Sequence, residues 1–209
     1  MKLLLSILII YLSLFMPEPT HIAEPNREPF GTEQKYEYYD TTGGTPLVLD
    51  NNPFVGIGQV FMIGTTGENE DHKATKIKVY LQKVNSPGDV TITLYEASPS
   101  IGEAIGTGTI AEGDISEGGW VECIINSSKI LVKDEFYAFG ITCPGADASN
   151  YVTVGISDNG YIGEFCKGMT VTTVGGWVLD TSDDLLFEIW GKKSKLQTAT
   201  PTHIGEPTH

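Results

Sequence analysis

The stretch ATKIKVYLQKVNSPGDVTITLYEA, residues 74–97, decides the fold class of this 209-residue chain. Two runs in which apolar residues alternate with polar or aromatic ones flank a short turn segment, as a strand with one buried face requires. The inward positions are Ile77, Val79, Leu81, Val90, Ile92 and Leu94. Pro87 fixes one turn dihedral, and Gly88 tolerates a positive φ. The stretch therefore predicts a β-hairpin whose outer face carries Tyr80 and Tyr95 as a cross-strand pair.

Strand-like runs continue through most of the chain, with Gly, Asp and Pro between them. The expected strands are 55–63, 76–83, 90–96, 106–112, 120–126, 135–142, 151–157, 169–173 and 185–191. No window of a dozen residues shows the 3.6-residue period of an amphipathic helix. The pattern predicts an all-β fold, an antiparallel and jelly-roll-like β-sandwich of about eight or nine strands.

The two ends of the chain differ in composition from the region between them. Lys2 precedes an apolar run that ends at Met16, a length that suits a signal-peptide core and is short for a membrane span. We expect a signal peptide or N-terminal anchor, and hence a secreted or cell-surface protein. The expected domains are that segment at 1–16, a Pro/Glu-rich linker at 17–35, the β-sandwich at 36–191 and a linker-like tail at 192–209.

A short motif occurs in both tails. The sequence PTHIAEP at 19–25 recurs as PTHIGEP at 201–207, with six of seven positions identical. Either these segments are linkers that flank a repeating domain, or they are a duplicated low-complexity sequence without a role. Both interpretations stay open at the level of the sequence.

Charge and motif content exclude several classes of function. A net charge of −14 and a pI near 4.5 disfavour nucleic acid and anionic lipid as partners, so no membrane contact is expected beyond the export segment. His21, His203 and His209 lie in the tails, and His72 lies in an acidic loop. The G-x-S-x-G, HExxH, CxxC and P-loop patterns do not occur. We therefore expect no enzyme, although a glycosidase needs only two carboxylates and stays an alternative.

The three cysteines are expected to have different roles. Cys123 falls on the apolar side of its strand beside Val121, which predicts a buried thiol. Cys143 and Cys166 both lie near strand ends, so one disulfide between them stays open.

A series of core and turn motifs carries a family resemblance. The motifs are 58–61, 77–81, 86–89, 90–95, 119–121, 136–139, 161–163, 176–177 and 184–188. In their order and spacing, from residue 53 to residue 191, they resemble the choice-of-anchor type of exported β-sandwich domain, which is similar to carbohydrate-binding modules and jelly rolls. The resemblance implies a non-catalytic module on secreted or surface proteins.

Aromatic residues are the candidate ligand contacts, because sugar rings stack on exposed aromatic rings. The candidates are Trp120, Trp177, Tyr151 and Tyr161. Trp120 and Trp177 each follow a Gly-Gly pair, which places them at junctions of loop and strand, with core packing as the alternative role. We expect a module for binding or adhesion with carbohydrate as the ligand. The alternative is a structural subunit of a surface layer, filament or appendage that self-assembles through its repeated tails.

Calcium is the candidate ion, because hard oxygen ligands occur in loops that the ends of a sandwich could bring together. The candidate ligands are Asp158, Asn159, Asp180 and Asp183. The alternative role for these side chains is to cap turns of the backbone.

Overall fold

The computed structural model describes residues 28–29, 31–41, 45–52, 54–97, 100–158, 160–161, 168–172, 176–179 and 183–195. All of them belong to one compact unit, Arg27–Lys195. The expected signal peptide and both copies of the repeated heptapeptide lie outside the described residues. Within the described part, no helix is long and apolar enough to cross a membrane.

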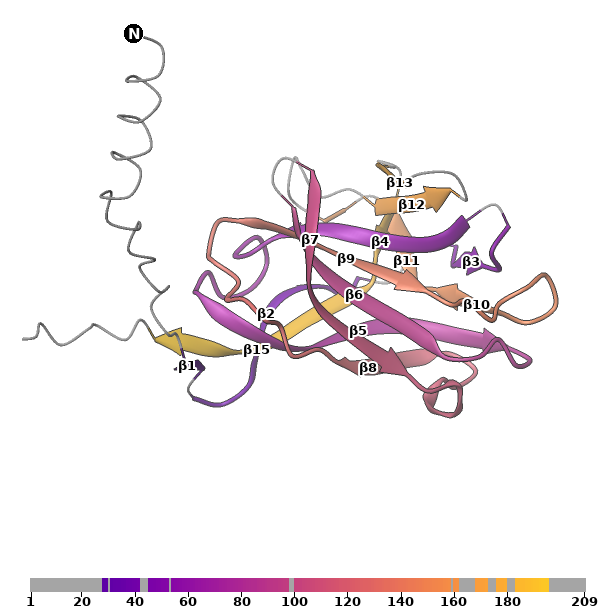
Figure 1. Ribbon diagram of the computed structural model, residues 1–209, viewed down its shortest axis with the longest axis horizontal. Coiled ribbons are helices and arrows are strands. Elements are labelled where there is room, and N and C mark those ends of the chain that lie inside the picture. Colours follow the sequence, from indigo (N-terminus) through magenta and orange to yellow (C-terminus); the bar gives the residue numbers. More distant parts are fainter. Residues whose placement is uncertain are drawn as a thin grey trace, which may run out of the picture. The chain divides into compact units, whose positions relative to one another are not determined.

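Two antiparallel sheets form this unit (Figure 1). The β5 sheet holds β1 Glu28–Pro29, β2 Gln34–Tyr39, β3 Leu47–Leu49, β5 His72–Val84, β8 Gly119–Ile124, β10 Tyr151–Val154 and β15 Phe187–Lys195. The β9 sheet holds β4 Phe54–Met62, β6 Val90–Ala97, β7 Ile101–Ile110, β9 Phe136–Thr142, β12 Gly168–Thr172 and β13 Gly176–Leu179. A small ladder pairs β11 Ile156–Asp158 with β14 Asp183–Leu185, and a 3-10 turn, η1, spans Glu112–Asp114.

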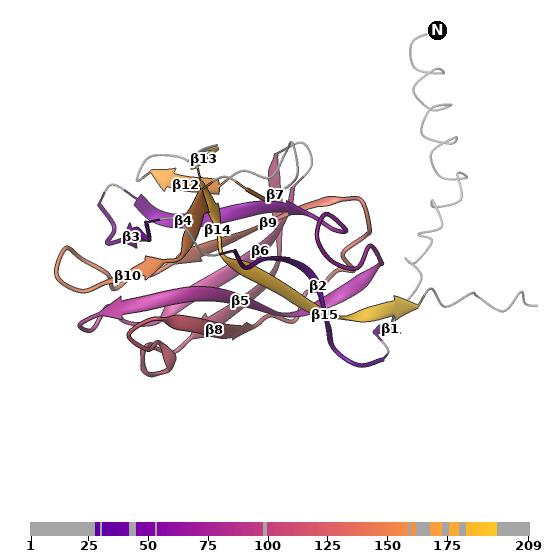
Figure 2. The ribbon, with the colours of Figure 1, turned by 180° about the vertical axis from the view of Figure 1, so that it is seen from behind.

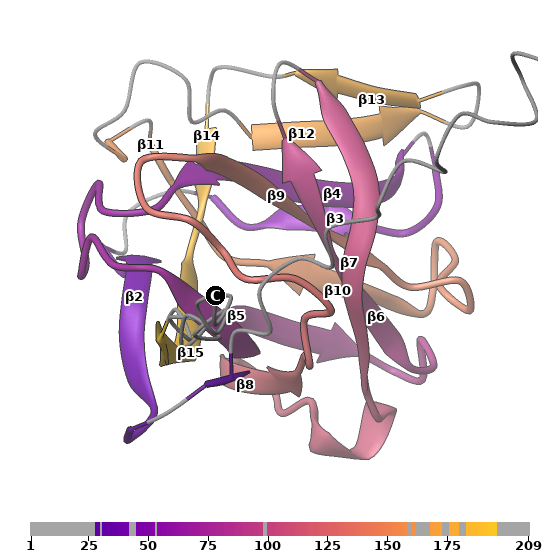
Figure 3. The same cartoon turned by 60° about the vertical axis from the view of Figure 1, so that its left-hand side comes forward.

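The all-β antiparallel sandwich is confirmed, with fifteen strands in the described part rather than eight or nine. Each of the nine expected strands has a counterpart. The number is larger because the run 151–157 divides at Gly155 into β10 and β11, and because short strands without an alternating pattern add to both sheets. Figure 3 shows the two layers, with β12, β4 and β9 above and β5, β15 and β8 below.

The predicted hairpin is wrong, because its two strands belong to different sheets. β5 pairs with β8, β10 and β15, whereas β6 pairs with β7 and β9. The turn segment between them is bonded to another loop instead of closing a ladder: Asn85 Nδ2 donates to the carbonyl oxygen of Ser149 at 2.6 Å. Asn85 and Gly88 both have positive φ, 55° and 85°, and the segment carries the chain from one layer to the other.

The predicted pairing of Tyr80 with Tyr95 is wrong for the same reason. Tyr80 lies opposite Trp120 in the β5 sheet, and Tyr95 lies opposite Ala104 and Ala138 in the β9 sheet. Alternation specifies which face of a strand is buried but does not specify which strand lies beside it.

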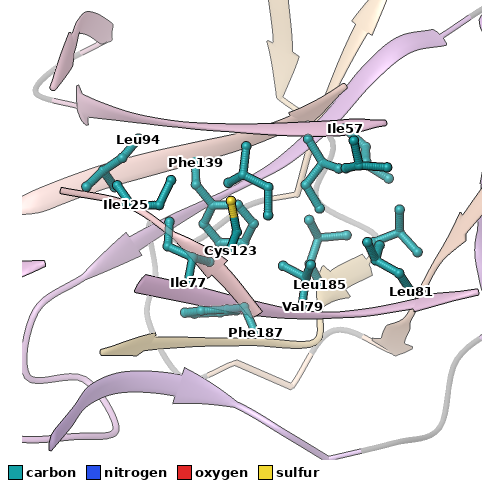
Figure 4. Close-up of a cluster of buried hydrophobic side chains, with 14 of the residues drawn as sticks. Ile57, Ile77, Val79, Leu81, Leu94, Cys123, Ile125, Phe139, Leu185 and Phe187 are labelled. Atoms are coloured by element: carbon teal, nitrogen blue, oxygen red, sulfur yellow. The ribbon is translucent and has the colours of Figure 1, made fainter. Parts of the chain in front are cut away.

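The predicted inward positions are confirmed. All six inward residues of the opening stretch have no exposed surface. They interleave with aromatic rings from both sheets, and the rings of Phe139 and Phe187 lie 5.5 Å apart. Figure 4 shows Leu94 and Phe139 from the β9 sheet facing Ile77 and Phe187 from the β5 sheet. Burying one such side chain contributes about 1.5–3 kcal/mol, so this shared layer holds the two sheets together.

The cysteines of the described part are buried. Cys123 is fully buried, as expected, and burial raises the pKa of its thiol to about 11. Cys143 is a buried free cysteine whose Sγ lies 3.4 Å from the carbonyl oxygen of Pro87. Cys166 lies outside the described residues.

Candidate functional site: the outer face of the β5 sheet

Three rows of side chains cross the face of the β5 sheet that points away from the core. They alternate with the inward residues of β5, because successive side chains of a strand point to opposite faces. The first row is Trp120 and Tyr80; the second is Glu122, Lys78, Glu188 and Tyr38; the third is Ile124, Lys76, Trp190 and Lys35. These ten residues are called the outer face below. Figure 2 shows that β2, β15, β5 and β8, which carry them, lie on one side of the molecule.

The first row forms an aromatic corner. Trp120 is 39% exposed, and its ring meets that of Tyr80 edge to face, with centroids 6.1 Å apart and an interplanar angle of 86°. Two glycines leave the space that Tyr80 occupies: a Cβ at Gly155 would lie 2.9 Å from Tyr80 Cβ, and one at Gly118 would lie 3.4 Å from Tyr80 Oη. The backbone N–H of Gly155 also donates to the carbonyl oxygen of Tyr80 at 2.8 Å. The corner is therefore held by its neighbours in a fixed arrangement.

Ion pairs balance the charges of the second and third rows. Lys76 Nζ lies 2.8 Å from a carboxylate oxygen of Glu33 and 3.0 Å from one of Glu122. The bond to Glu33 raises the pKa of Lys76 and lowers the pKa of Glu33. Lys35 pairs with Glu188 at 3.2 Å. The lysines of these rows thus have partners within the face or at its border.

The aromatic rings of the second and third rows lie under lysine ammonium groups. Lys76 and Lys78 lie 5.0 and 5.1 Å from the ring centroid of Trp190, and Lys35 lies 3.9 Å from that of Tyr38. These distances suit cation–π attraction. Trp190 Nε1 also donates to Glu188 at 2.7 Å. Trp190 is therefore engaged with its neighbours, whereas Trp120 presents the more open ring.

The structure brings together only some of the predicted ligand contacts. Tyr151 lies in β10 opposite Val84, half-buried, and alternation places it on the same side of the β5 sheet as Trp120. Trp177 lies in β13 opposite Val171, in the β9 sheet, so it shares no sheet with Trp120; its side chain lies outside the described part. Tyr161 is buried, with 5% of its surface exposed.

Tyr161 belongs to a buried polar cluster that the sequence does not reveal. Its hydroxyl donates to Glu37 Oε1 at 2.6 Å. Glu37 is fully buried, and its carboxylate accepts the backbone N–H groups of three consecutive residues, Gly64 at 2.9 Å, Thr65 at 3.0 Å and Thr66 at 2.9 Å. It also accepts the hydroxyl of Thr66. Neutral donors therefore satisfy this carboxylate, and it ties the 64–66 loop to β2.

A second buried carboxylate, Asp184, continues the cluster. It accepts Gln59 Nε2 at 3.0 Å and the backbone N–H groups of Gly160 at 3.2 Å and Tyr161 at 3.1 Å. Gln59 Oε1 in turn accepts the N–H of Leu185 at 2.8 Å. These bonds join β4, β14 and the Gly160–Tyr161 segment. Their role is to position chain segments, since neither carboxylate faces solvent.

Two of the predicted calcium ligands lie opposite each other on paired strands. Asp158 in β11 is in register with Asp183 in β14. Asn159 and Asp180 lie outside the described residues. Among the residues that are described, no three His, Cys, Asp or Glu side chains gather as a metal site. Calcium binding stays a prediction.

Comparison with known proteins finds no family model and no curated protein that matches this chain. The likeness to choice-of-anchor domains therefore stays a resemblance in sequence motifs. The antiparallel sheets packed face to face are the part of it that the structure shows.

Proposed function

We propose that this protein is a non-catalytic, secreted or cell-surface module for binding or adhesion, which takes carbohydrate on the outer face of the β5 sheet. The observation that carries the proposal is the aromatic corner of Trp120 and Tyr80, with Trp120 39% exposed. An exposed ring offers an apolar surface on which the apolar side of a sugar ring can stack. Tyr151 lies on the same side of the sheet opposite Val84, four residues further along β5 than Tyr80, and offers a separate aromatic ring.

Polar groups next to the corner suit sugar hydroxyls. Glu122 and Lys78, directly opposite each other in the second row, offer an acceptor and a donor beside Trp120 and Tyr80. Their side chains are 42% and 28% exposed. A sheet holds such groups in place before binding, and this reduces the entropy cost of association. The second and third rows, together with Glu33 at their border, hold three lysines and three glutamates, and this balance of charge favours an uncharged ligand.

The test compares three proteins for binding to an array of immobilised glycans: the wild type, Trp120→Ala and Val132→Ala. Val132 is a matched control because its side chain is also exposed, at 37%, but lies outside the outer face. Loss of the stacking ring should weaken binding about tenfold or more. Val132→Ala should bind as the wild type does, and urea midpoints should show that both variants fold. The proposal fails if no glycan binds the wild type, or if Trp120→Ala binds every glycan equally well.

A structural subunit is the second candidate, and one observation favours it. β1 pairs antiparallel with the end of β15, with Glu28 opposite Lys195 and Pro29 opposite Ser194 (Figure 1). The first and last strands of the described part are therefore neighbours. Tail-mediated assembly predicts oligomers in sedimentation velocity that disappear when residues 197–209 are deleted. A strictly monomeric full-length protein at high concentration would contradict it.

A glycosidase is the third candidate and has the weakest support. Glu122 and Glu188 lie on either side of Lys78 in the second row, two strand spacings apart, which is about 10 Å between backbones. Each is ion-paired with a lysine, Glu122 with Lys76 and Glu188 with Lys35. Both carboxylates are thus already engaged by lysines of the outer face. The binding role is therefore the one proposed.

A further inference from the structure

His72 occupies a position where the two ends of the domain meet. It was expected in an acidic loop, but it is the first residue of β5 and is fully buried. Its imidazole stacks on the ring of Tyr36 in β2, with centroids 3.7 Å apart and an interplanar angle of 6°. On another side it faces β15: a Cβ at Gly191 would lie 2.8 Å from His72 Cδ2. The ring therefore contacts both β2 and β15.

Hydrogen bonds fix the tautomer of this imidazole. His72 Nδ1 lies 3.0 Å from the carbonyl oxygen of Glu70, which can only accept, so Nδ1 carries the proton. Nε2 is then a bare acceptor, and it has no hydrogen-bond partner among the described residues. The backbone is fixed as well, because the N–H and C=O of His72 bond to Leu131 at 3.0 and 2.8 Å. A proton added to Nε2 would place a charge in a buried position without an acceptor.

The charged groups around His72 do not supply that acceptor. On the elements packed against it they are Glu68, Glu70 and Asp71 in the preceding loop, Lys73 in β5, Lys35 and Glu37 in β2, Lys192 and Lys193 in β15, and Lys133 and Asp134 beyond Leu131. Glu70 is ion-paired with Lys193, and Asp71 accepts the N–H of Lys133 at 3.1 Å. Burial lowers the pKa of His72 to about 4, although the Glu70 carbonyl and the charge of Asp71 act in the opposite direction.

The residues that meet here are called the chain-end junction: Glu28–Pro29, Tyr36, His72 and Gly191–Lys195. We propose that His72 is an acid-sensitive latch of this junction, which holds the two ends of the domain side by side when neutral and lets them part when protonated. The proposal is independent of ligand binding on the outer face. It assigns a response to acid to the place where the first and last strands of the described part pair.

The direction of the effect follows from the two states of the ring. In the open junction His72 meets water and regains its ordinary pKa of 6.5, whereas in the closed junction the pKa is about 4. The closed state is therefore fully favoured above pH 6.5, and this advantage is lost as the pH falls towards 4. Between pH 8 and pH 5 the opening equilibrium constant should rise about 30-fold.

Hydrogen exchange of the full-length chain tests the proposal, with rates corrected for the intrinsic effect of pH. The wild type and His72→Phe are compared at pH 8 and pH 5, because Phe keeps a ring against Tyr36 and does not titrate. In the wild type, amides of β15 and β2 should lose about 30-fold in protection at pH 5, while those of β9 keep theirs. In His72→Phe this loss should be absent.

Two results would overturn the proposal. One is the same loss of protection at pH 5 in His72→Phe as in the wild type. The other is an equal loss in β9 and β15, which would indicate global acid unfolding. If His72→Phe does not fold, an NMR titration of the imidazole in the wild type takes its place: an ordinary pKa near 6.5 refutes the latch, and a pKa near 4 together with loss of protection in β15 but not in β9 supports it.

Discussion

Carboxylates of this protein are held in two different ways, on the outer face and inside the sandwich. On the outer face Glu122 and Glu188 pair with lysines that are themselves partly exposed. Inside, Glu37 and Asp184 are satisfied by backbone N–H groups, hydroxyls and one amide, with no lysine or arginine among their hydrogen-bond partners in the described part. A carboxylate on the surface is thus paired with an opposite charge, whereas each buried carboxylate accepts hydrogen bonds from several neutral donors.

The difference separates residues that specify the fold from residues that are available for binding. Removing Glu37 would leave several buried donors without an acceptor, and each such group costs about 1–3 kcal/mol. Removing Glu122 takes one partner from Lys76 and Lys78, but both ammonium groups are partly exposed, so water can replace that partner. Stability should therefore depend on the inner carboxylates, whereas the outer ones can change partners when a ligand arrives.

The largest effect is expected from Glu37→Ala. It removes the acceptor of three backbone N–H groups and of the hydroxyls of Thr66 and Tyr161. We expect a loss of about 3–5 kcal/mol in the free energy of unfolding, measured by urea denaturation. Glu122→Ala is the matched control and should lose less than about 1 kcal/mol. Equal losses for the two variants would remove the distinction between the inner and outer carboxylates.

A smaller effect is expected from Asp184→Asn. The amide keeps one oxygen for the N–H groups of Gly160 and Tyr161 but turns an NH₂ group towards Gln59 Nε2, which is itself a donor. We expect about 1–3 kcal/mol of destabilisation in the same experiment. A variant as stable as the wild type would mean that Gln59 rearranges without cost, and that the cluster is less constrained than its bonds indicate.

The smallest effect is expected from Lys76→Ala on the outer face. The variant loses the ion pairs with Glu33 and Glu122 and the contact with Trp190. We expect the free energy of unfolding to fall by at most about 1 kcal/mol at low salt. The loss should be smaller in 0.5 M NaCl, because added salt shortens the screening length to below about 10 Å and weakens exposed ion pairs. Thermal unfolding at the two salt concentrations measures this. A loss that is large and independent of salt would place Lys76 among the residues that specify the fold.

The sequence predicted the strands and the buried faces well, because both depend on local alternation. Ile77, Val79 and Leu81 could face only one way once the strand formed, and all three are fully buried. The partner of a strand depends on distant parts of the chain, so the neighbour of Tyr80 was predicted wrongly. Trp120 lies forty residues further on, and nothing local to either residue connects them.

β2 escaped prediction for a different reason. A bulge opposite Ile189 and Trp190 turns two consecutive residues, Tyr36 and Glu37, into the interior. This breaks the alternation that marks a strand, and a glutamate in a polar segment gives no sign of burial. Trp120 was found as a candidate because it is aromatic and because the Gly-Gly pair before it places it where a loop meets a strand. The surrounding rows of the outer face come from four strands, and only the sheet order reveals them.

We propose that the outer face, rather than another surface, receives the ligand. Amide NMR spectra of the full-length protein, recorded while the best-binding oligosaccharide from the array is added, test it most directly. The shifted signals should cluster in β8 and the adjoining part of β5, around Trp120 and Tyr80. Shifts confined to the β9 sheet, or to the 64–66 loop, would contradict it.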